Sequence, residues 1–143
     1  MKSKFIAVAL VSGLMASLGA YAEPIVSGAA IDNGDCVLLG ETVTLNLSNN
    51  VSGAYNCVEA TSTITLGACH ASGSRNPTTV NCVNSAAPGD APVWNDTSCQ
   101  DAGDTFEITD FRGFRASSQG GRVGVVALGG TCSDQSIDAV VTN

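Results

Sequence analysis

Apolar residues recur at every second position in several short stretches of the chain, which is the pattern of β-strands with one buried face. Such alternation occurs over residues 42–47, 62–66, 78–83 and 105–109. In the first stretch, Val43, Leu45 and Leu47 would face one way and the polar residues between them the other. A more continuous apolar run over residues 122–128 is typical of a central strand. Residues 136–142 predict a final strand.

Glycine, asparagine, serine and proline cluster between these stretches, and glycine and asparagine supply the positive φ angles of tight hairpin turns. No credible amphipathic helix of ordinary length follows residue 22. The sequence therefore predicts an all-β fold, a small antiparallel sandwich or barrel stapled by disulfides. We divide the chain into a signal peptide over 1–22, an extended N-terminal segment over 23–35 and a single disulfide-rich β domain over 36–143.

The N-terminus has the three parts of a cleavable secretory signal. Lys2 and Lys4 form a short positive region, and an uncharged apolar run extends from Phe5 to Leu18. Ala20 and Ala22 are the small residues that signal peptidase requires before its cut. The run is shorter than the roughly 20 residues of a membrane-spanning helix. We expect a protein that is secreted, periplasmic or on the cell surface, with no membrane span in the mature chain. The MKSK start and the compact apolar run after it favour a bacterial source.

Charge excludes two classes of partner for the mature chain. A cut after Ala22 leaves 121 of the 143 residues and removes both lysines. Four arginines then stand against 13 acidic residues, which gives a net charge of −9. Such a domain has no positive surface to attract nucleic acid or anionic lipid.

An even number of cysteines in an exported chain predicts disulfides. They are Cys36, Cys57, Cys69, Cys82, Cys99 and Cys132. Six cysteines allow 15 connectivities, and bridges between neighbouring strands of a meander would favour the pairs Cys36–Cys57, Cys69–Cys82 and Cys99–Cys132. Close ligand pairs such as C-x-x-C, which are typical of zinc sites, do not occur, and we expect no cofactor.

Catalytic chemistry has little support in the sequence. His70 is the only histidine, and it stands in a Ser- and Gly-rich stretch without a G-x-S-x-G motif. We therefore predict no catalytic residues. Asp96, Asp101 and Asp104 are weak candidates for calcium, because hard cations prefer several carboxylates on one flexible loop. Their spacing does not fit an EF-hand, and a solvated turn is the simpler interpretation.

Arginine and aromatic residues gather in one stretch, and both types are favoured at binding hot spots. This possible binding surface comprises Phe111, Arg112, Phe114, Arg115 and Arg122. The alternative is simple charge neutralisation, because Glu107 and Asp110 lie close in sequence.

These observations favour a secreted or cell-surface, non-catalytic protein that serves as a structural subunit or adhesive module of an extracellular assembly. Both ends of the mature chain are predicted to be extended strands, which could add to the sheet of another molecule, so we expect protein partners or self-association through strand edges. The first alternative is a soluble extracellular binding module or inhibitor that uses the Arg112–Arg122 loop. A small secreted hydrolase is a less favoured alternative.

Overall fold

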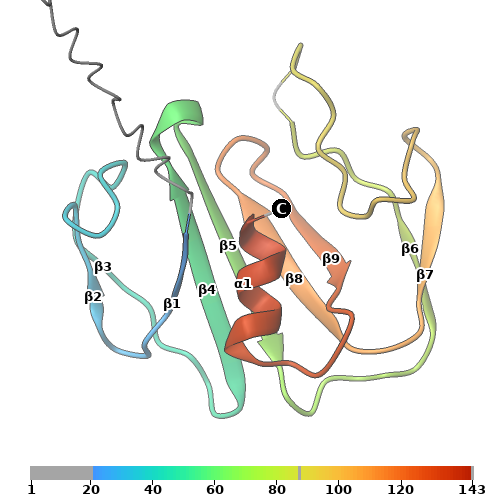
Figure 1. Ribbon diagram of the computed structural model, residues 1–143, viewed down its shortest axis with the longest axis horizontal. Coiled ribbons are helices and arrows are strands. Elements are labelled where there is room, and N and C mark those ends of the chain that lie inside the picture. Colours follow the sequence, from blue (N-terminus) through green and yellow to red (C-terminus); the bar gives the residue numbers. More distant parts are fainter. Residues whose placement is uncertain (1–20, 87, 143) are drawn as a thin grey trace, which may run out of the picture.

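A five-stranded antiparallel sheet forms the centre of the molecule, with its strands in the order β1-β4-β5-β8-β9. The computed structural model describes residues 21–86 and 88–142. One helix, α1, covers one face of this sheet, and the ribbons β2–β3 and β6–β7 flank it on its two sides (Figure 1). In chain order the elements are β1 (Ala22–Pro24), β2 (Ala30–Ile31), β3 (Val43–Thr44), β4 (Val51–Val58), the 3-10 helix η1 (Glu59–Thr61), β5 (Thr63–His70), β6 (Thr78–Asn81), β7 (Thr105–Ile108), β8 (Arg112–Ser117), β9 (Val123–Ala127) and α1 (Asp134–Thr142).

The structure confirms a mostly antiparallel β-fold with three disulfides. The final strand predicted over residues 136–142 is wrong, because this segment is helical. A capping box starts the helix: the Ser133 hydroxyl accepts the Ser136 N–H at 3.2 Å, and the Ser136 hydroxyl accepts the Ser133 N–H at 2.9 Å. Asp134 adds a negative charge at the positive end of the helix dipole.

Glycines in two adjacent inner strands, β5 and β8, let α1 approach the sheet closely. A Cβ on Gly67 in β5 would lie 2.7 Å from Cγ1 of Val141, and one on Gly113 in β8 would lie 2.8 Å from Cδ2 of Leu128. Ile137 and Val141, which are 0% and 2% exposed, fill the space above these glycines together with Ala54 of β4. The main core therefore lies between the helix and the backbone of the central strands.

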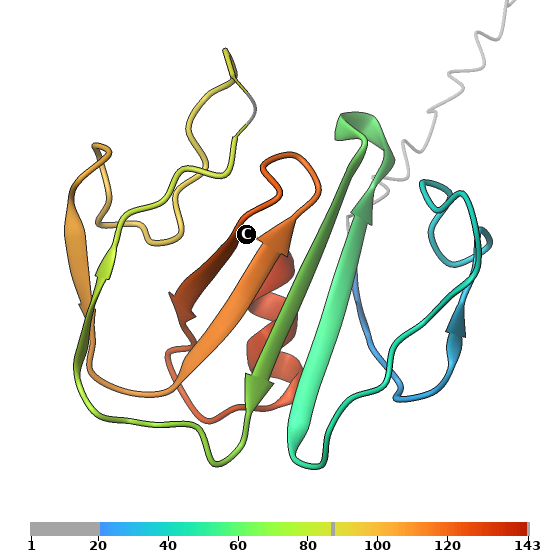
Figure 2. The ribbon, with the colours of Figure 1, turned by 180° about the vertical axis from the view of Figure 1, so that it is seen from behind.

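The opposite face of the sheet carries the alternate residues of the same strands, and no helix of the described residues covers it (Figure 2). In β5, for example, Ile64 and Leu66 face away from α1. Beside β9, a second core forms where Phe106 and Ile108 of β7 pack with Val125 of β9. The two ribbons thus flank a sheet face that is partly open.

Several strand predictions need correction. The run over residues 122–128, interpreted as a central strand, contains β9 at the edge of the sheet. The regular part of the stretch over residues 42–47 is only β3. Two strands of the central sheet, β4 and β8, were not predicted, because Ser52 and Gly53 resemble a turn and Arg112–Ser117 was interpreted as part of a binding loop.

The disulfides are Cys36–Cys57, Cys69–Cys132 and Cys82–Cys99. The first predicted pair is confirmed, and the other two are wrong. The Cys82–Cys99 disulfide links the end of the β6 segment to the loop that leads to β7. Both cysteines are therefore paired within the region of the second core. Cys69 lies on the helix side of β5 and forms its disulfide with Cys132, a residue just before α1.

The close helix–sheet contact predicts that Gly67→Ala destabilises the protein by about 1–3 kcal/mol, because the added methyl group overpacks the core. Gly124→Ala is the matched control, since a Cβ on Gly124 would lie 3.7 Å from its nearest neighbour, an ordinary contact. Urea denaturation of both variants measures the difference. Equal stability of the two variants would contradict this account of the core.

Candidate functional site

An apolar groove lies between the β2–β3 ribbon, called the N-terminal ribbon below, and the sheet face that α1 does not cover. Its volume is about 410 Å³. The ribbon and its loop contribute one wall, and the strands β4 and β5 contribute the floor. The apolar lining consists mainly of Ile31, Leu39, Val43, Leu45, Tyr55, Ile64 and Leu66. Val43 and Leu45 are two of the three residues whose alternation predicted a common face, and they do share this site.

A disulfide joins the ribbon to the sheet at the groove, and a hydrogen bond fixes Tyr55 in the floor. The Cys36–Cys57 disulfide joins the ribbon side to β4, and Cys36 itself lines the groove. The Tyr55 hydroxyl donates to Oε2 of Glu23 at 2.8 Å. Burial, and secondly this hydrogen bond to Glu23, raise the pKa of Tyr55 above its usual value of 10.0, so the ring stays neutral.

A polar rim borders the apolar lining at the end of β8. Ser117, Ser118 and Gly121 line this side. The backbone N–H of Ser118 donates to the Ile64 carbonyl at 2.9 Å, and the Ile64 N–H donates to the Ser118 hydroxyl at 3.0 Å. These bonds continue the β5–β8 pairing past the end of the strand and fix the rim. The arrangement suits an apolar group of a ligand.

The arginine-rich stretch does not form one surface. The guanidinium of Arg112 is turned toward the loop before β6 and donates to the Asn76 carbonyl at 2.9 Å. Phe114, which is 50% exposed, lies on the open face of the sheet, whereas its neighbour Arg115 lies on the helix side. Phe111 stacks with Arg75, whose guanidinium carbon is 5.1 Å from the ring centre. Arg122 lies exposed just before β9.

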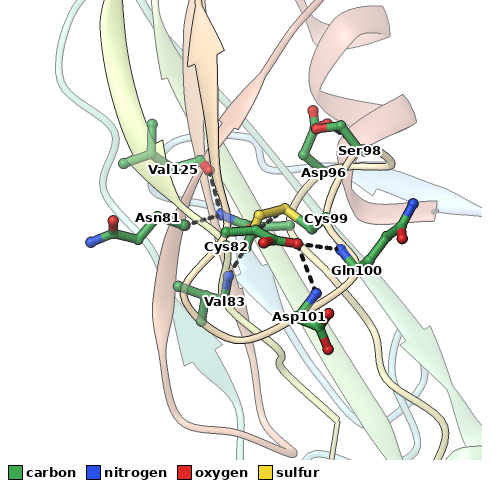
Figure 3. Close-up of a disulfide and its surroundings, with 11 residues drawn as sticks. Asn81, Cys82, Val83, Asp96, Ser98, Cys99, Gln100, Asp101 and Val125 are labelled. Atoms are coloured by element: carbon green, nitrogen blue, oxygen red, sulfur yellow. Dashed lines mark hydrogen bonds between the residues drawn. A yellow bond between two sulfur atoms is a disulfide. The ribbon is translucent and has the colours of Figure 1, made fainter.

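Two of the three candidate calcium ligands, Asp96 and Asp104, bind their own loop through their carboxylates, and Asp101 contributes its backbone N–H. Oδ2 of Asp104 accepts the N–H groups of Asp101 and Gln100 at 2.9 and 3.0 Å, and Oδ1 of Asp96 accepts the N–H and hydroxyl of Ser98 at 2.9 and 2.7 Å. Figure 3 shows this loop beside the Cys82–Cys99 disulfide. Within 21–86 and 88–142, no group of three or more potential metal-ligating side chains occurs. The carboxylates of Asp96 and Asp104 fix the conformation of the turn that contains Cys99.

His70 ends β5 at the surface. Its Nδ1 accepts the N–H of Ser72 at 3.0 Å, which fixes a short turn. This hydrogen bond gives the histidine a local structural role.

Comparison with known proteins adds no relative: the chain matches no protein family, no curated protein and no solved structure. Among the residues that the structure describes, no helix has both the length and the apolar character needed to cross a lipid bilayer. Sequence reasoning missed Tyr55 and Leu39 as parts of a site. The available signal was the alternation of Val43 and Leu45, which showed a common face but not what would lie opposite it.

The Asp104 turn predicts a pH-dependent stability. Its hydrogen bonds with the N–H groups of Asp101 and Gln100 lower the pKa of this carboxyl below its usual 3.8. The ionised form therefore stabilises the fold above that value, and the contribution is lost as the pH falls through the lowered pKa. Asp104→Asn should lower the Tm at about pH 6 but not at about pH 2, as measured by circular dichroism.

Asp90→Asn is the control for this experiment, because Asp90 is an exposed loop carboxylate. It should leave the Tm unchanged at both pH values. A Tm difference for Asp104→Asn that persists undiminished in acid would show that the charge is not what stabilises the turn.

Proposed function

We propose that the mature chain is a secreted or cell-surface, non-catalytic binding module, adhesive in role, which holds an apolar group of its ligand in the groove between the N-terminal ribbon and the sheet. The observation that carries this proposal is the groove itself. Its volume of about 410 Å³ falls in the range of small-molecule sites, which span roughly 300–1,000 Å³.

The composition of the groove defines the class of ligand. Aliphatic side chains and one neutral tyrosine line it, and the nearest polar groups are the serines of the rim. An uncharged apolar ligand, or an apolar side chain of a partner protein, would therefore gain about 25 cal/mol for each Å² of apolar surface that it removes from water. A charged ligand would lose hydration there without gaining a partner.

Assembly through strand edges, the other possibility suggested by the sequence, has less support. The edge strand β1 contains Pro24, which has no N–H to offer to an added strand. At the opposite edge, the Val125 carbonyl of β9 already accepts the Nδ2 of Asn95 at 3.3 Å. Both features are typical of edges that are protected against pairing with another chain.

Binding in the groove can be tested with the neutral fluorescent probe N-phenyl-1-naphthylamine. We expect a saturable rise in its emission with the wild-type protein. Leu66→Gln should weaken binding by at least about tenfold, because it places an amide in the apolar floor.

The matched control is Val123→Gln. Val123 lies on the same sheet face as Leu66, because Leu66 pairs with Ala116 and Ala116 pairs with Val123. Unlike Leu66, Val123 does not line the groove. The Val123→Gln variant should bind the probe with the affinity of the wild-type protein. Equal loss in both variants, or no saturable binding to the wild type, would refute the proposed site.

The proposed export of the chain rests on the signal-like N-terminus, of which residues 1–20 lie outside the described residues, and on the three disulfides, which fit an oxidising compartment. We expect the exported protein to begin at Glu23 and to contain no free thiol. N-terminal sequencing and thiol titration of the denatured, unreduced protein would check both points. A retained Met1 or titratable thiols would contradict export and oxidation.

A further inference from the structure

A second cavity, of about 610 Å³, lies on the helix side of the sheet, beside the edge strand β9. Residues of α1, of β9 and of the loop over residues 93–99 surround it. Its apolar lining includes Trp94, Val126, Leu128 and Val140. This cavity is separate from the apolar groove, which lies across the sheet, and the two sites share no lining residue.

Arg115 is the cation in the lining of this cavity. Its side chain lies on the helix side of β8, and its cross-strand partner is Gly124, which has no side chain to cover it. The Nε atom is buried and has no hydrogen-bond partner. Within the described part of the chain, the guanidinium forms no hydrogen bond or ion pair. Arg112, by contrast, donates three hydrogen bonds to the loop before β6.

An unpaired, partly buried guanidinium is an unfavourable arrangement for the protein alone. Burial removes water from the charge, and it is the cause that lowers the pKa of Arg115 from its usual value. No protein group compensates for that loss. A bound carboxylate would do so, because the guanidinium fork matches its two oxygens.

We propose that the cavity beside β9 binds a small organic monocarboxylate, whose carboxylate pairs with Arg115 and whose aromatic or branched apolar part packs against Trp94 and the aliphatic lining. The volume accommodates such a molecule. Asp96 also lines the cavity, and its charge disfavours ligands with two negative charges. Monocarboxylates are therefore preferred over phosphate.

Trp94 provides a direct readout, because it is the only tryptophan of the chain and it lines the cavity. We would titrate the wild-type protein with phenylacetate and follow the tryptophan emission. A saturable change should appear at ligand concentrations below about 10 mM. Phenylacetamide, which has the same shape without the charge, should bind at least about tenfold more weakly, and inorganic phosphate should produce no saturable change.

Arg115→Met replaces the aliphatic part of the side chain by one of similar shape and removes the guanidinium with its charge. It should weaken phenylacetate binding by at least about tenfold while the Tm stays the same or rises, because no interaction within the protein is lost. Arg75→Met, an exposed arginine on another loop, is the control and should leave binding unchanged.

Three results would overturn the proposal: no saturable change with phenylacetate, equal binding of phenylacetate and phenylacetamide, or unimpaired binding by Arg115→Met. The comparison of the two probes uses the wild type only, so it remains decisive even if the variant fails to fold. Binding of N-phenyl-1-naphthylamine in the groove is measured separately, so failure at one site does not affect the conclusion about the other.

Discussion

The fold depends on direct contact between a helix and the backbone of the sheet. Gly67 and Gly113 lie in two adjacent inner strands, β5 and β8, and their missing side chains leave room for Leu128, Ile137 and Val141. The Cys69–Cys132 disulfide ties the start of the helix to the same sheet, and the Asn56 side chain donates to the Val141 carbonyl near its end at 3.2 Å. Because the bridge spans 63 residues, the chain-entropy estimate of its stabilisation is about 4 kcal/mol. Few large side chains are needed where the two layers lie so close.

The sequence predicts the β character and the presence of disulfides because both are local signals. Period-two alternation located β5, β6 and β7, and an even cysteine count behind a signal-like N-terminus predicted three bridges. The C-terminal helix was missed because Ile and Val are common in strands. The spacing of Ile137, Val140 and Val141, together with the Ser133–Ser136 capping box, was the available signal. The two wrong bridges follow from the assumption that successive cysteines pair between neighbouring strands of a meander, whereas Cys69 bonds to Cys132 over a separation of 63 residues.

The sites were less predictable than the fold, because each combines residues that are distant along the chain. The sequence identified Arg115 as one of a group, but the alternation of β8 sends it and Phe114 to opposite faces. Its isolation depends on Gly124 and on the loop that contains Trp94, neither of which is close in sequence. The groove likewise needs the fold of residues 30–45 over β4 and β5. Patterns show which side chains share a face, whereas a cavity depends on what lies across from them.

The position of β1 bears on the proposed removal of the N-terminal segment. In the uncut chain Ala22 pairs with Asn56 and packs against the main core, so the proposed cleavage point between Ala22 and Glu23 lies inside β1. A peptidase needs this segment free and extended in its own active site. If the chain is exported as proposed, the cut therefore has to come before β1 pairs with β4. A chain that paired these two strands first would shield its own cleavage point from the peptidase.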